Sequence, residues 1–224
     1  MNLTDRDNSR FGIRLLHLCD DTPFSEYSEL VGRVSPARYK RITACCDDKS
    51  KTVLLFSELF AKYSVSEAFS LPYVSINIAL GEYGKPYVCK HDEMQFSLSH
   101  SENYIAFVAS DEPAGIDIEY IAKRDKRIEN RFFTSNERAF IESSDDCDEA
   151  FYRIWTAKEA YVKYTGKGFV TSPASFDTRL PPIEQKIYTV RYNNFCISVC
   201  SANRAVIPVT EQSVSLFLKR LLQL

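Results

Sequence analysis

The strongest constraint in this sequence is a hydrophobic pattern that predicts a long helix followed by two antiparallel strands. Residues 49–64 place apolar side chains at helical intervals, Phe56 and Phe60 among them. Residues 94–100, "MQFSLSH", and 104–110, "YIAFVAS", are then predicted as strands on either side of the short turn "SEN". Two strands joined by a tight turn form a hairpin, so we expect this half of the chain to pack a helix on an antiparallel sheet.

The second half repeats this order of elements, although no residue-level repeat accompanies it. A helical pattern over 146–165 is followed by alternating segments at 185–192 and 195–202. These segments flank the two-residue turn Asn193-Asn194, which predicts a second hairpin. A helix followed by a hairpin is therefore expected twice.

The stretch "DEPAG" at 111–115 interrupts the strand pattern between these two units. We therefore predict an α+β fold of two similar, pseudo-duplicated halves, each a helix packed on a small, mainly antiparallel sheet. The predicted halves are residues 1–112 and 113–224. At the end of the chain, "SVSLFLKRLLQL" spaces its apolar residues as one helical stripe, which we interpret as a packing helix rather than a membrane binder.

Three shorter segments complete the pattern. "FGIRLLHL" and "YVSINIAL" are predicted as further strands of the first half. "SPARYKR" carries a turn signal in front of the first long helix.

Composition and charge exclude several classes of function. The chain has 224 residues, 45% of them hydrophobic, and 28 Lys and Arg against 30 Asp and Glu give a net charge of −2. Charge this close to neutral provides no bulk field for nucleic acid or a membrane surface, so neither is expected as a partner. The start "MNLTDRDNSRFGIRLLHL" carries charges where a secretory signal needs an apolar run, and no apolar stretch reaches the roughly 18 residues that span a bilayer. Seven cysteines without CxxC spacing fit a reducing compartment, so we expect a cytoplasmic protein.

Two carboxylates stand two residues apart in the apolar segment "GIDIEYI". On a strand, Asp117 and Glu119 point to the same face, and like charges this close are unfavourable unless a cation lies between them. One interpretation is a sheet edge with solvated acids. The other is a hard-cation site, because Mg²⁺ prefers oxygen ligands and is commonly held by one or two carboxylates.

A second charged stretch, "IWTAKEAYVKYTGKGF" at 154–169, lies on a predicted helix that Gly166 ends. Trp155, Glu159 and Lys163 fall along one side of this helix. A Glu-to-Lys pair four residues apart is often only a surface pair. Trp155 marks the buried face, however, and Glu159 falls at its boundary, where an acid needs a partner. We interpret Trp155 as core packing and Glu159 as a candidate functional acid.

Three linked blocks, "GIDIE", "RFFTSNE" and "WTAKEAYVKYTGKG", resemble in order and spacing the signature of the 4′-phosphopantetheinyl transferases. The segments "SPARYKR", "EYGKP" and "FSLSHS" are similar to the CoA-handling segments of the longer, Sfp-type branch, so the resemblance spans roughly residues 33–175. This family transfers the phosphopantetheine arm of coenzyme A to a serine of a carrier protein, with Mg²⁺, and releases 3′,5′-ADP. The resemblance implies a monomer whose active site lies in the cleft between its two halves.

The resemblance also assigns the catalytic residues. Asp117, Glu119 and Glu159 match the family's magnesium ligands, and Mn²⁺ is an expected substitute for the metal. Glu137 matches a further acid of the site, and either Glu137 or Glu159 is the base that takes the serine proton. Lys163 matches the lysine that contacts the phosphate under attack.

The CoA contacts are implied in the same way. Basic residues of "SPARYKR" and a threonine match contacts to the 3′-phosphate, and a turn lysine and the "SH" pair match further phosphate contacts. For the first lysine of the helix motif, a CoA contact and a structural role both stay open. The implied CoA residues are Arg38, Arg41, Thr52, Lys85, Ser99, His100 and Lys158. The chain departs from the family at Glu102, where glycine often follows "SHS", and this bears on the tightness of the hairpin.

The basic run "KRDKRIENR" at 123–131 is the implied docking surface for an acidic apo acyl or peptidyl carrier protein, with a solvated basic face as the alternative. Two other functions stay open. One is a Mg²⁺-dependent hydrolase that cleaves the CoA pyrophosphate, but a hydrolase needs no protein acceptor for this basic run. The other is a catalytically silent CoA-binding or carrier-binding protein, which the joint presence of the four acids and Lys163 argues against.

Overall fold

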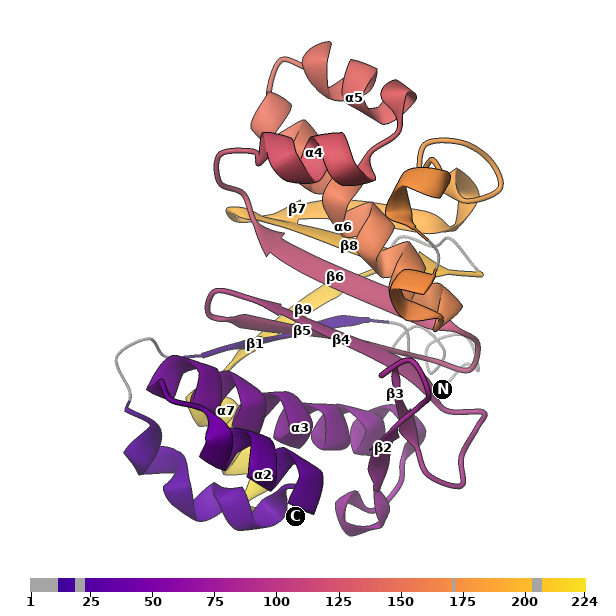
Figure 1. Ribbon diagram of the computed structural model, residues 1–224. Helices are drawn as coiled ribbons and strands as arrows, with labels where there is room; N and C mark the ends of the chain where they lie inside the picture. The colour runs from indigo at the N-terminus through magenta and orange to yellow at the C-terminus, as the bar shows by residue number, and fades with distance from the viewer. Residues whose placement is uncertain (1–11, 19–22, 171, 203–206) are drawn as a thin grey trace.

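A computed structural model of the chain describes residues 12–18, 23–170, 172–202 and 207–224. Figure 1 shows two halves stacked one above the other, each with a sheet facing the other half and helices on the outside. The first eleven residues, on which the expectation about a secretory signal rests, lie outside the described residues. None of the described helices is both long enough and apolar enough to cross a bilayer.

The first half is a four-stranded sheet covered on one face by helices (Figure 1). Its strand order is β4-β5-β1-β9, and every pair is antiparallel except the parallel pair of β1 and β9. A small separate hairpin joins β2 to β3. The elements of this half are β1 (Ile13–His17), α2 (Pro36–Ala44), α3 (Asp48–Phe69), β2 (Ile78–Leu80), β3 (Pro86–Val88), β4 (Gln95–Ser101), β5 (Tyr104–Ser110), β9 (Val209–Ser213) and α7 (Val214–Leu221).

The second half is a three-stranded antiparallel sheet in the order β6-β8-β7, with α6 packed against it. Both halves contain the same unit, because a first strand pairs with the second strand of a later hairpin and a long helix lies between them in sequence. The predicted α+β fold with two pseudo-duplicated halves is thereby confirmed. The elements of this half are β6 (Ala114–Tyr120), α4 (Lys126–Phe132), α5 (Ser135–Glu142), α6 (Cys147–Thr165), β7 (Ile187–Tyr192) and β8 (Phe195–Ser201).

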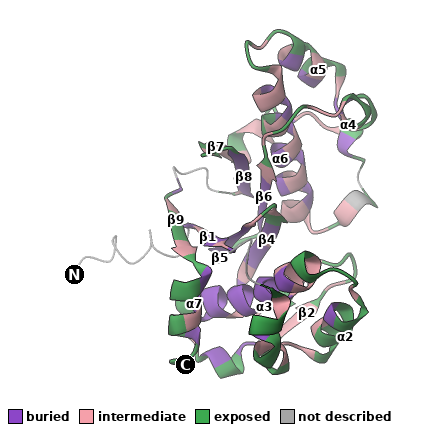
Figure 2. Cartoon of the chain, turned by 90° about the vertical axis from the view of Figure 1, so that its left-hand side faces the viewer, coloured by how far each residue is buried: buried purple, intermediate pink, exposed green. Residues whose placement is uncertain are grey.

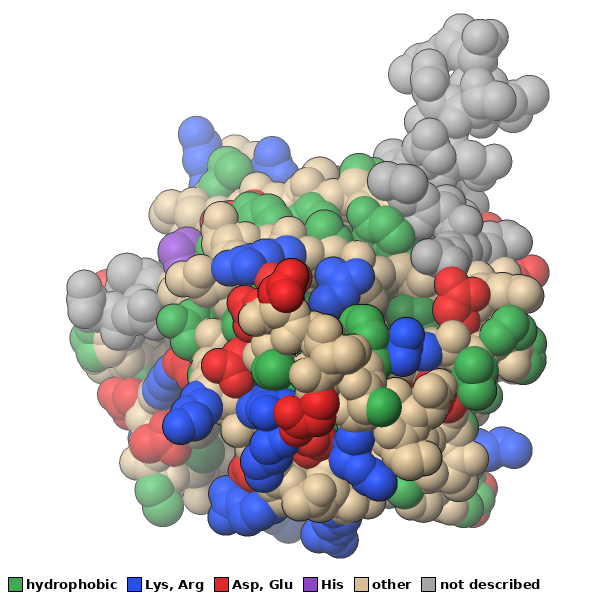
Figure 3. All heavy atoms as spheres, turned by 90° about the horizontal axis from the view of Figure 1, so that it is seen from above, with side chains coloured by type: hydrophobic (Ala, Val, Ile, Leu, Met, Phe, Trp, Pro, Cys, Tyr) green, Lys and Arg blue, Asp and Glu red, His purple; other side chains and the backbone are tan. Residues whose placement is uncertain are grey.

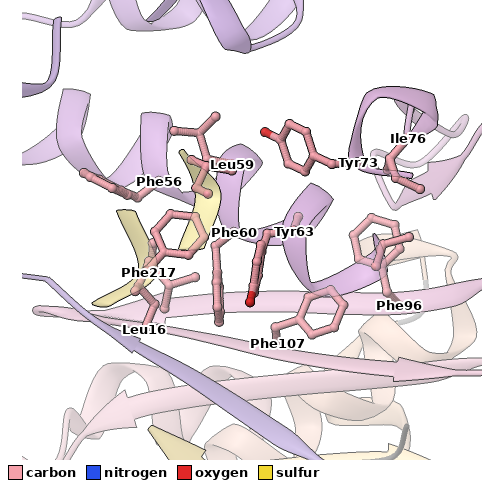
Figure 4. Close-up of a cluster of buried hydrophobic side chains, with 14 of the residues drawn as sticks. Leu16, Phe56, Leu59, Phe60, Tyr63, Tyr73, Ile76, Phe96, Phe107 and Phe217 are labelled. Carbon is pink, nitrogen blue, oxygen red and sulfur yellow. The ribbon is translucent and has the colours of Figure 1, made fainter. Parts of the chain in front are cut away.

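The main hydrophobic core lies between α3 and the first sheet, and α7 closes it (Figure 4). Phe217 of α7 is fully buried and meets Phe56 and Phe60 edge-on. A second core fills the space between the two sheets, where Ile116 and Ile118 of β6 are fully buried. Figure 2 accordingly shows buried residues along α3 and the strands between the halves, and exposed ones on the outer faces of the helices.

Both predicted hairpins are confirmed, and both long helices form close to the predicted bounds. Glu102 adopts a left-handed φ of 48°, so the first hairpin keeps a tight turn without glycine. The last strand and helix, although they follow residue 113, lie with the first sheet and its core. The boundary between the predicted halves stays a prediction.

Other local expectations were wrong. "SPARYKR" is not a turn, because Ser35 accepts a hydrogen bond from the Arg38 amide and Pro36 takes the first helical position, which starts α2. Of "YVSINIAL", only the end forms a strand. Helices α4 and α5 were not predicted, although Thr134 and Glu137 have the spacing of a capping box at the start of α5.

Candidate active site

The site forms where α6 lies directly on β6. A Cβ atom at Gly115 would stand 2.0 Å from the carbonyl oxygen of Ala160 and 2.5 Å from the amide nitrogen of Tyr164. Only glycine therefore permits this approach of helix to strand. Asp117 and Glu119 follow Gly115 at intervals of two along the strand, so both carboxylates share its face, next to the helix.

Asp117 is the centre of the polar contacts. Its Oδ1 accepts hydrogen bonds from Lys163 Nζ and from Ser99 Oγ, both at 2.7 Å, and Lys163 Nζ also lies 2.9 Å from Ser99 Oγ. Asp117 is 4% exposed, so its charge is held in a poorly solvated place. Strand β4, strand β6 and helix α6 thus each place one side chain in a single buried ion-paired cluster, at the junction of the two halves.

Two further carboxyls crowd this cluster and hold protons more tightly than usual. Desolvation, then repulsion by Asp117, raises the pKa of Glu119 to about 7, against which hydrogen bonds from Ser101 and Trp155 act. Desolvation and the same repulsion raise the pKa of Glu159 to about 7, with Lys163 acting in the opposite direction. The site therefore holds three carboxyl groups beside one ammonium group, that of Lys163.

Asp117, Glu119 and Glu159 fit a divalent cation, although their side chains are not yet arranged around one position. Within the described ranges, no group of three or more His, Cys, Asp or Glu side chains is already arranged to hold a metal ion. However, Asp117 Oδ2 and Glu159 Oε1 are both buried oxygens without a hydrogen-bond partner. Unpartnered carboxylate oxygens next to acids of raised pKa are the donor set that Mg²⁺ prefers, so Asp117, Glu119 and Glu159 are the residues that would hold it.

Glu137 and Lys158 lie apart from this cluster and form a buried structural pair. Both are 0% exposed, and Lys158 Nζ lies 2.8 Å from Glu137 Oε2. The other contacts of this ammonium are the carbonyl oxygens of Pro173 and Phe176, each at 2.7 Å. Three acceptors use all three N–H groups of the lysine, so no donor is left for CoA.

Both carboxylate oxygens of Glu137 also accept hydrogen bonds. Oε2 also accepts the Thr134 amide, which completes a capping box at the start of α5, and Oε1 accepts the amide and hydroxyl of Thr178. A carboxylate bonded on both oxygens is a poor proton acceptor. In this structure the side chains of Glu137 and Lys158 bind only protein groups, and their catalytic and CoA roles stay predictions.

Arg38 and Arg41 line a pocket of about 490 Å³ between α2, α3, the β2–β3 hairpin and β4. Glu58, 7% exposed, orients one of these cations, because its Oε2 lies 3.3 Å from Arg38 Nε. The same carboxylate accepts the amide of Ser35 at 2.5 Å and so ties the start of α2 to α3. The pocket combines two guanidinium groups with apolar walls, which suits a phosphorylated nucleotide.

The other predicted CoA residues do not line this pocket. His100 is within electrostatic reach of both Lys163 and Arg38, since desolvation and then Lys163 lower its pKa and Arg38 adds to the shift. Lys85 reaches from the β2–β3 turn to the carbonyl oxygen of Ala114, at 3.1 Å. Thr52 is not among the residues lining the pocket, and its hydroxyl donates to the helix carbonyl of Asp48 at 2.8 Å.

Sequence reasoning missed Ser101 and Glu58. Ser101 Oγ lies 3.1 Å from Glu119 Oε2, and the alternation of "SLSHS" was a signal that it shares a face with Ser99. Glu58 had no signal beyond being an acid on a largely buried helix.

Comparison with known proteins matches two family profiles to this chain. The profile of the 4′-phosphopantetheinyl transferase superfamily matches residues 113–210, and that of the N-terminal part of 4′-phosphopantetheinyl transferases matches residues 22–112. This chain belongs to the 4′-phosphopantetheinyl transferase superfamily. As a member of this superfamily it is an enzyme of the transferase class.

Individual relatives agree with the family profiles. A 4′-phosphopantetheinyl transferase of Bacillus subtilis is 29% identical over 164 residues, which cover 71% of this chain and 73% of that protein. The 4′-phosphopantetheinyl transferase gsp of Aneurinibacillus migulanus is 30% identical over 67% of this chain and 63% of its own length. The 4′-phosphopantetheinyl transferase AcpT of Salmonella typhimurium is 42% identical over 106 residues, or 45% of this chain and 55% of its own length.

The close contact between α6 and β6 can be tested by adding one methyl group at Gly115. Gly115→Ala should lower the free energy of unfolding by about 1–3 kcal/mol, because the added Cβ overlaps helix backbone that cannot move aside locally. Urea unfolding measures the change. Gly32→Ala is the matched control, since no atom lies within 4 Å of its Cβ position, and it should change stability by less than about 0.5 kcal/mol. Equal effects of the two substitutions would contradict the close contact.

The raised pKa of Glu159 predicts a pH-dependent gain in stability when its charge is removed. An acid whose pKa is higher in the folded protein than in the unfolded chain stabilises the fold less as pH rises from about 4.5 to about 7. Metal-free Glu159→Gln should therefore be more stable than wild type at pH 8, by about 1–3 kcal/mol, and equal to it near pH 4.5. Thermal unfolding with a chelator present, over this pH range, measures the difference.

Glu142→Gln supplies the control of opposite sign. Hydrogen bonds from Lys126 and Arg124 lower the pKa of this exposed acid, so its neutral substitute should be slightly less stable than wild type at pH 8. A Glu159→Gln variant that loses stability at pH 8 would show that the charge of Glu159 is already balanced in the folded protein.

Proposed function

We propose that this enzyme transfers the phosphopantetheine arm of coenzyme A to a serine of an apo acyl or peptidyl carrier protein, with Mg²⁺, and releases 3′,5′-ADP. The observation that carries the proposal is the ion pair of Asp117 and Lys163, with Glu119 and Glu159 beside it at the junction of the halves. A cluster with an excess of carboxylate, next to a pocket lined by Arg38 and Arg41, suits a metal-bound pyrophosphate whose nucleotide end is held by arginine.

In this proposal the acids and Lys163 divide the chemistry. The serine oxygen forms a bond to the β-phosphorus of CoA, and the bond from that phosphorus to the bridging oxygen breaks as 3′,5′-ADP leaves. Glu159 takes the serine proton with the carboxylate oxygen that the cation does not hold. Lys163 stabilises the charge on the non-bridging phosphate oxygens. Bound Mg²⁺ supplies further neutralisation of the pyrophosphate charge.

The compartment and the oligomeric state belong to the same proposal. A monomer is proposed because the two halves of this one chain meet at the site. Six cysteines of the described residues are free thiols, which fits the reducing cytoplasm.

The transfer reaction is tested by the intact mass of an apo carrier protein after incubation with enzyme, CoA and Mg²⁺. Wild type should add one phosphopantetheine arm, whereas Glu159→Ala should be slower by at least about 100-fold because it lacks the base. A metal-free reaction should leave the carrier unmodified. If CoA is cleaved and acyl and peptidyl carriers both stay apo, the enzyme is a hydrolase, and the transfer proposal fails.

We also propose that the carrier docks on the α4 side, although the basic run at 123–131 is less free than its sequence suggests. Figure 3 looks down on this end, where basic and acidic side chains lie interspersed. Most of the cations have acidic partners: Arg124 and Lys126 with Glu129 and Glu142, and Arg127 with Asp125. Lys123 and Arg131 are exposed and form no ion pair with the described residues, so they are the cations left for an acidic partner.

Charge reversal at these two positions tests the docking proposal. The double variant Lys123→Glu and Arg131→Glu should raise the KM for the carrier several-fold, because complementary charge steers the encounter, and it should leave the KM for CoA unchanged. Lys219→Glu on α7 is the control, since this exposed lysine lies on the other half. An unchanged carrier KM in the double variant would place the docking surface elsewhere.

A further inference from the structure

Strands β4 and β6 lie at the edges of two different sheets, and serine side chains join them in place of a backbone ladder. Ser97 Oγ accepts a hydrogen bond from the amide of Ile116 at 3.0 Å. Ser101 Oγ accepts one from the amide of Tyr120, also at 3.0 Å. Two N–H groups on the edge of β6 are therefore satisfied by hydroxyls of β4, and the two sheets stay separate.

Two serines of β4 also bind the acids of the site. Ser99 Oγ donates to Asp117 Oδ1 at 2.7 Å, and Ser101 Oγ donates to Glu119 Oε2 at 3.1 Å. Serine spacing on β4 thus matches carboxylate spacing on β6, two residues in each case. Of the three serines Ser97, Ser99 and Ser101 on β4, only Ser97 binds a backbone amide and no carboxylate.

The hydroxyl of Ser101 has a fixed direction. It accepts from the amide of Tyr120, the residue next to Glu119, so its proton is left to point at the carboxylate. A glutamate with three rotatable bonds next to the like charge of Asp117 would otherwise turn away from it. The contact between the halves therefore fixes the position of this acid.

We propose that Ser101 is a positioning residue that holds Glu119 in the geometry needed to bind a divalent cation, so that the cation site is complete only when β4 is docked on β6. The inference rests on the proposed function, because it concerns the same acids. Groups that orient a metal ligand without touching the metal typically contribute 10-fold to 100-fold to affinity, so removal of one hydroxyl is expected to be measurable.

The test compares two serines of one strand in the full chain without CoA. Titration calorimetry with Mn²⁺ should give a Kd about 10-fold weaker for Ser101→Ala than for wild type, because Glu119 then keeps only its hydrogen bond from Trp155. Ser97→Ala removes an equivalent link between β4 and β6 but touches no carboxylate, so it should lower Tm and leave the Kd unchanged.

A second pair of variants separates the hydroxyl from the shape of the side chain, and it serves if Ser101→Ala does not fold. Ser101→Thr keeps the hydroxyl and should retain the wild-type Kd, whereas the near-isosteric Ser101→Val should show the loss. The role of Ser101 would be overturned if Ser101→Thr and Ser101→Val bound Mn²⁺ with equal Kd values. Equal Kd values for Ser101→Ala and Ser97→Ala would overturn it as well. In both cases the transferase proposal stands. Absence of Mn²⁺ and Mg²⁺ binding by wild type would overturn both this role and the metal-dependent mechanism.

Discussion

The direct contact of α6 with β6 is the constraint on which the rest of the site depends. Gly115 has no side chain, and the helix uses that space, since any Cβ would overlap its backbone. This contact brings Glu159 and Lys163, which belong to a helix, within reach of Asp117, which belongs to a strand. A helix lying one side chain further away would leave a buried carboxylate without its ammonium, which is a costly arrangement. The packing of the second half and the chemistry of the site therefore depend on the same glycine.

Helix α6 directs two adjacent charged residues, Lys158 and Glu159, to different surroundings. Lys158 and Glu159 are adjacent, so their side chains point about 100° apart around the helix. Lys158 is turned to the loop at 173–178 and to Glu137, where every donor and acceptor is used. Glu159 is turned to the acids of β6 and retains an unpartnered oxygen. Lys158 and Glu137 thus have all their hydrogen bonds made within the protein, whereas Glu159 keeps an oxygen that can accept a further bond.

The sequence predicted the elements that carry local periodicity, and it could not predict contacts between distant elements. Alternation placed Asp117 and Glu119 on one face, and the helix motif placed Glu159 and Lys163 together. The same motif gave no means to separate Glu137 and Lys158 from the reactive pair, because the loop that covers Lys158 follows the helix in sequence and its path is set by tertiary packing. The pairing of Arg38 with Glu58 joins two helices, and the link from Ser101 to Glu119 joins two sheets. Neither contact follows from the spacing of residues along one element.

The pairing of β1 with β9 has a consequence for how the protein is made. Residues 13–17 form one of the two inner strands of the first sheet, and residues 209–213 are their parallel neighbour. The helix that follows seals the aromatic core over α3. During synthesis, the second half is therefore complete before the first half can finish, because the first sheet stays open until residues 209–213 have been made. An unfinished chain exposes a strand edge and several phenylalanines, which makes this interval the one in which the nascent protein most needs protection from aggregation.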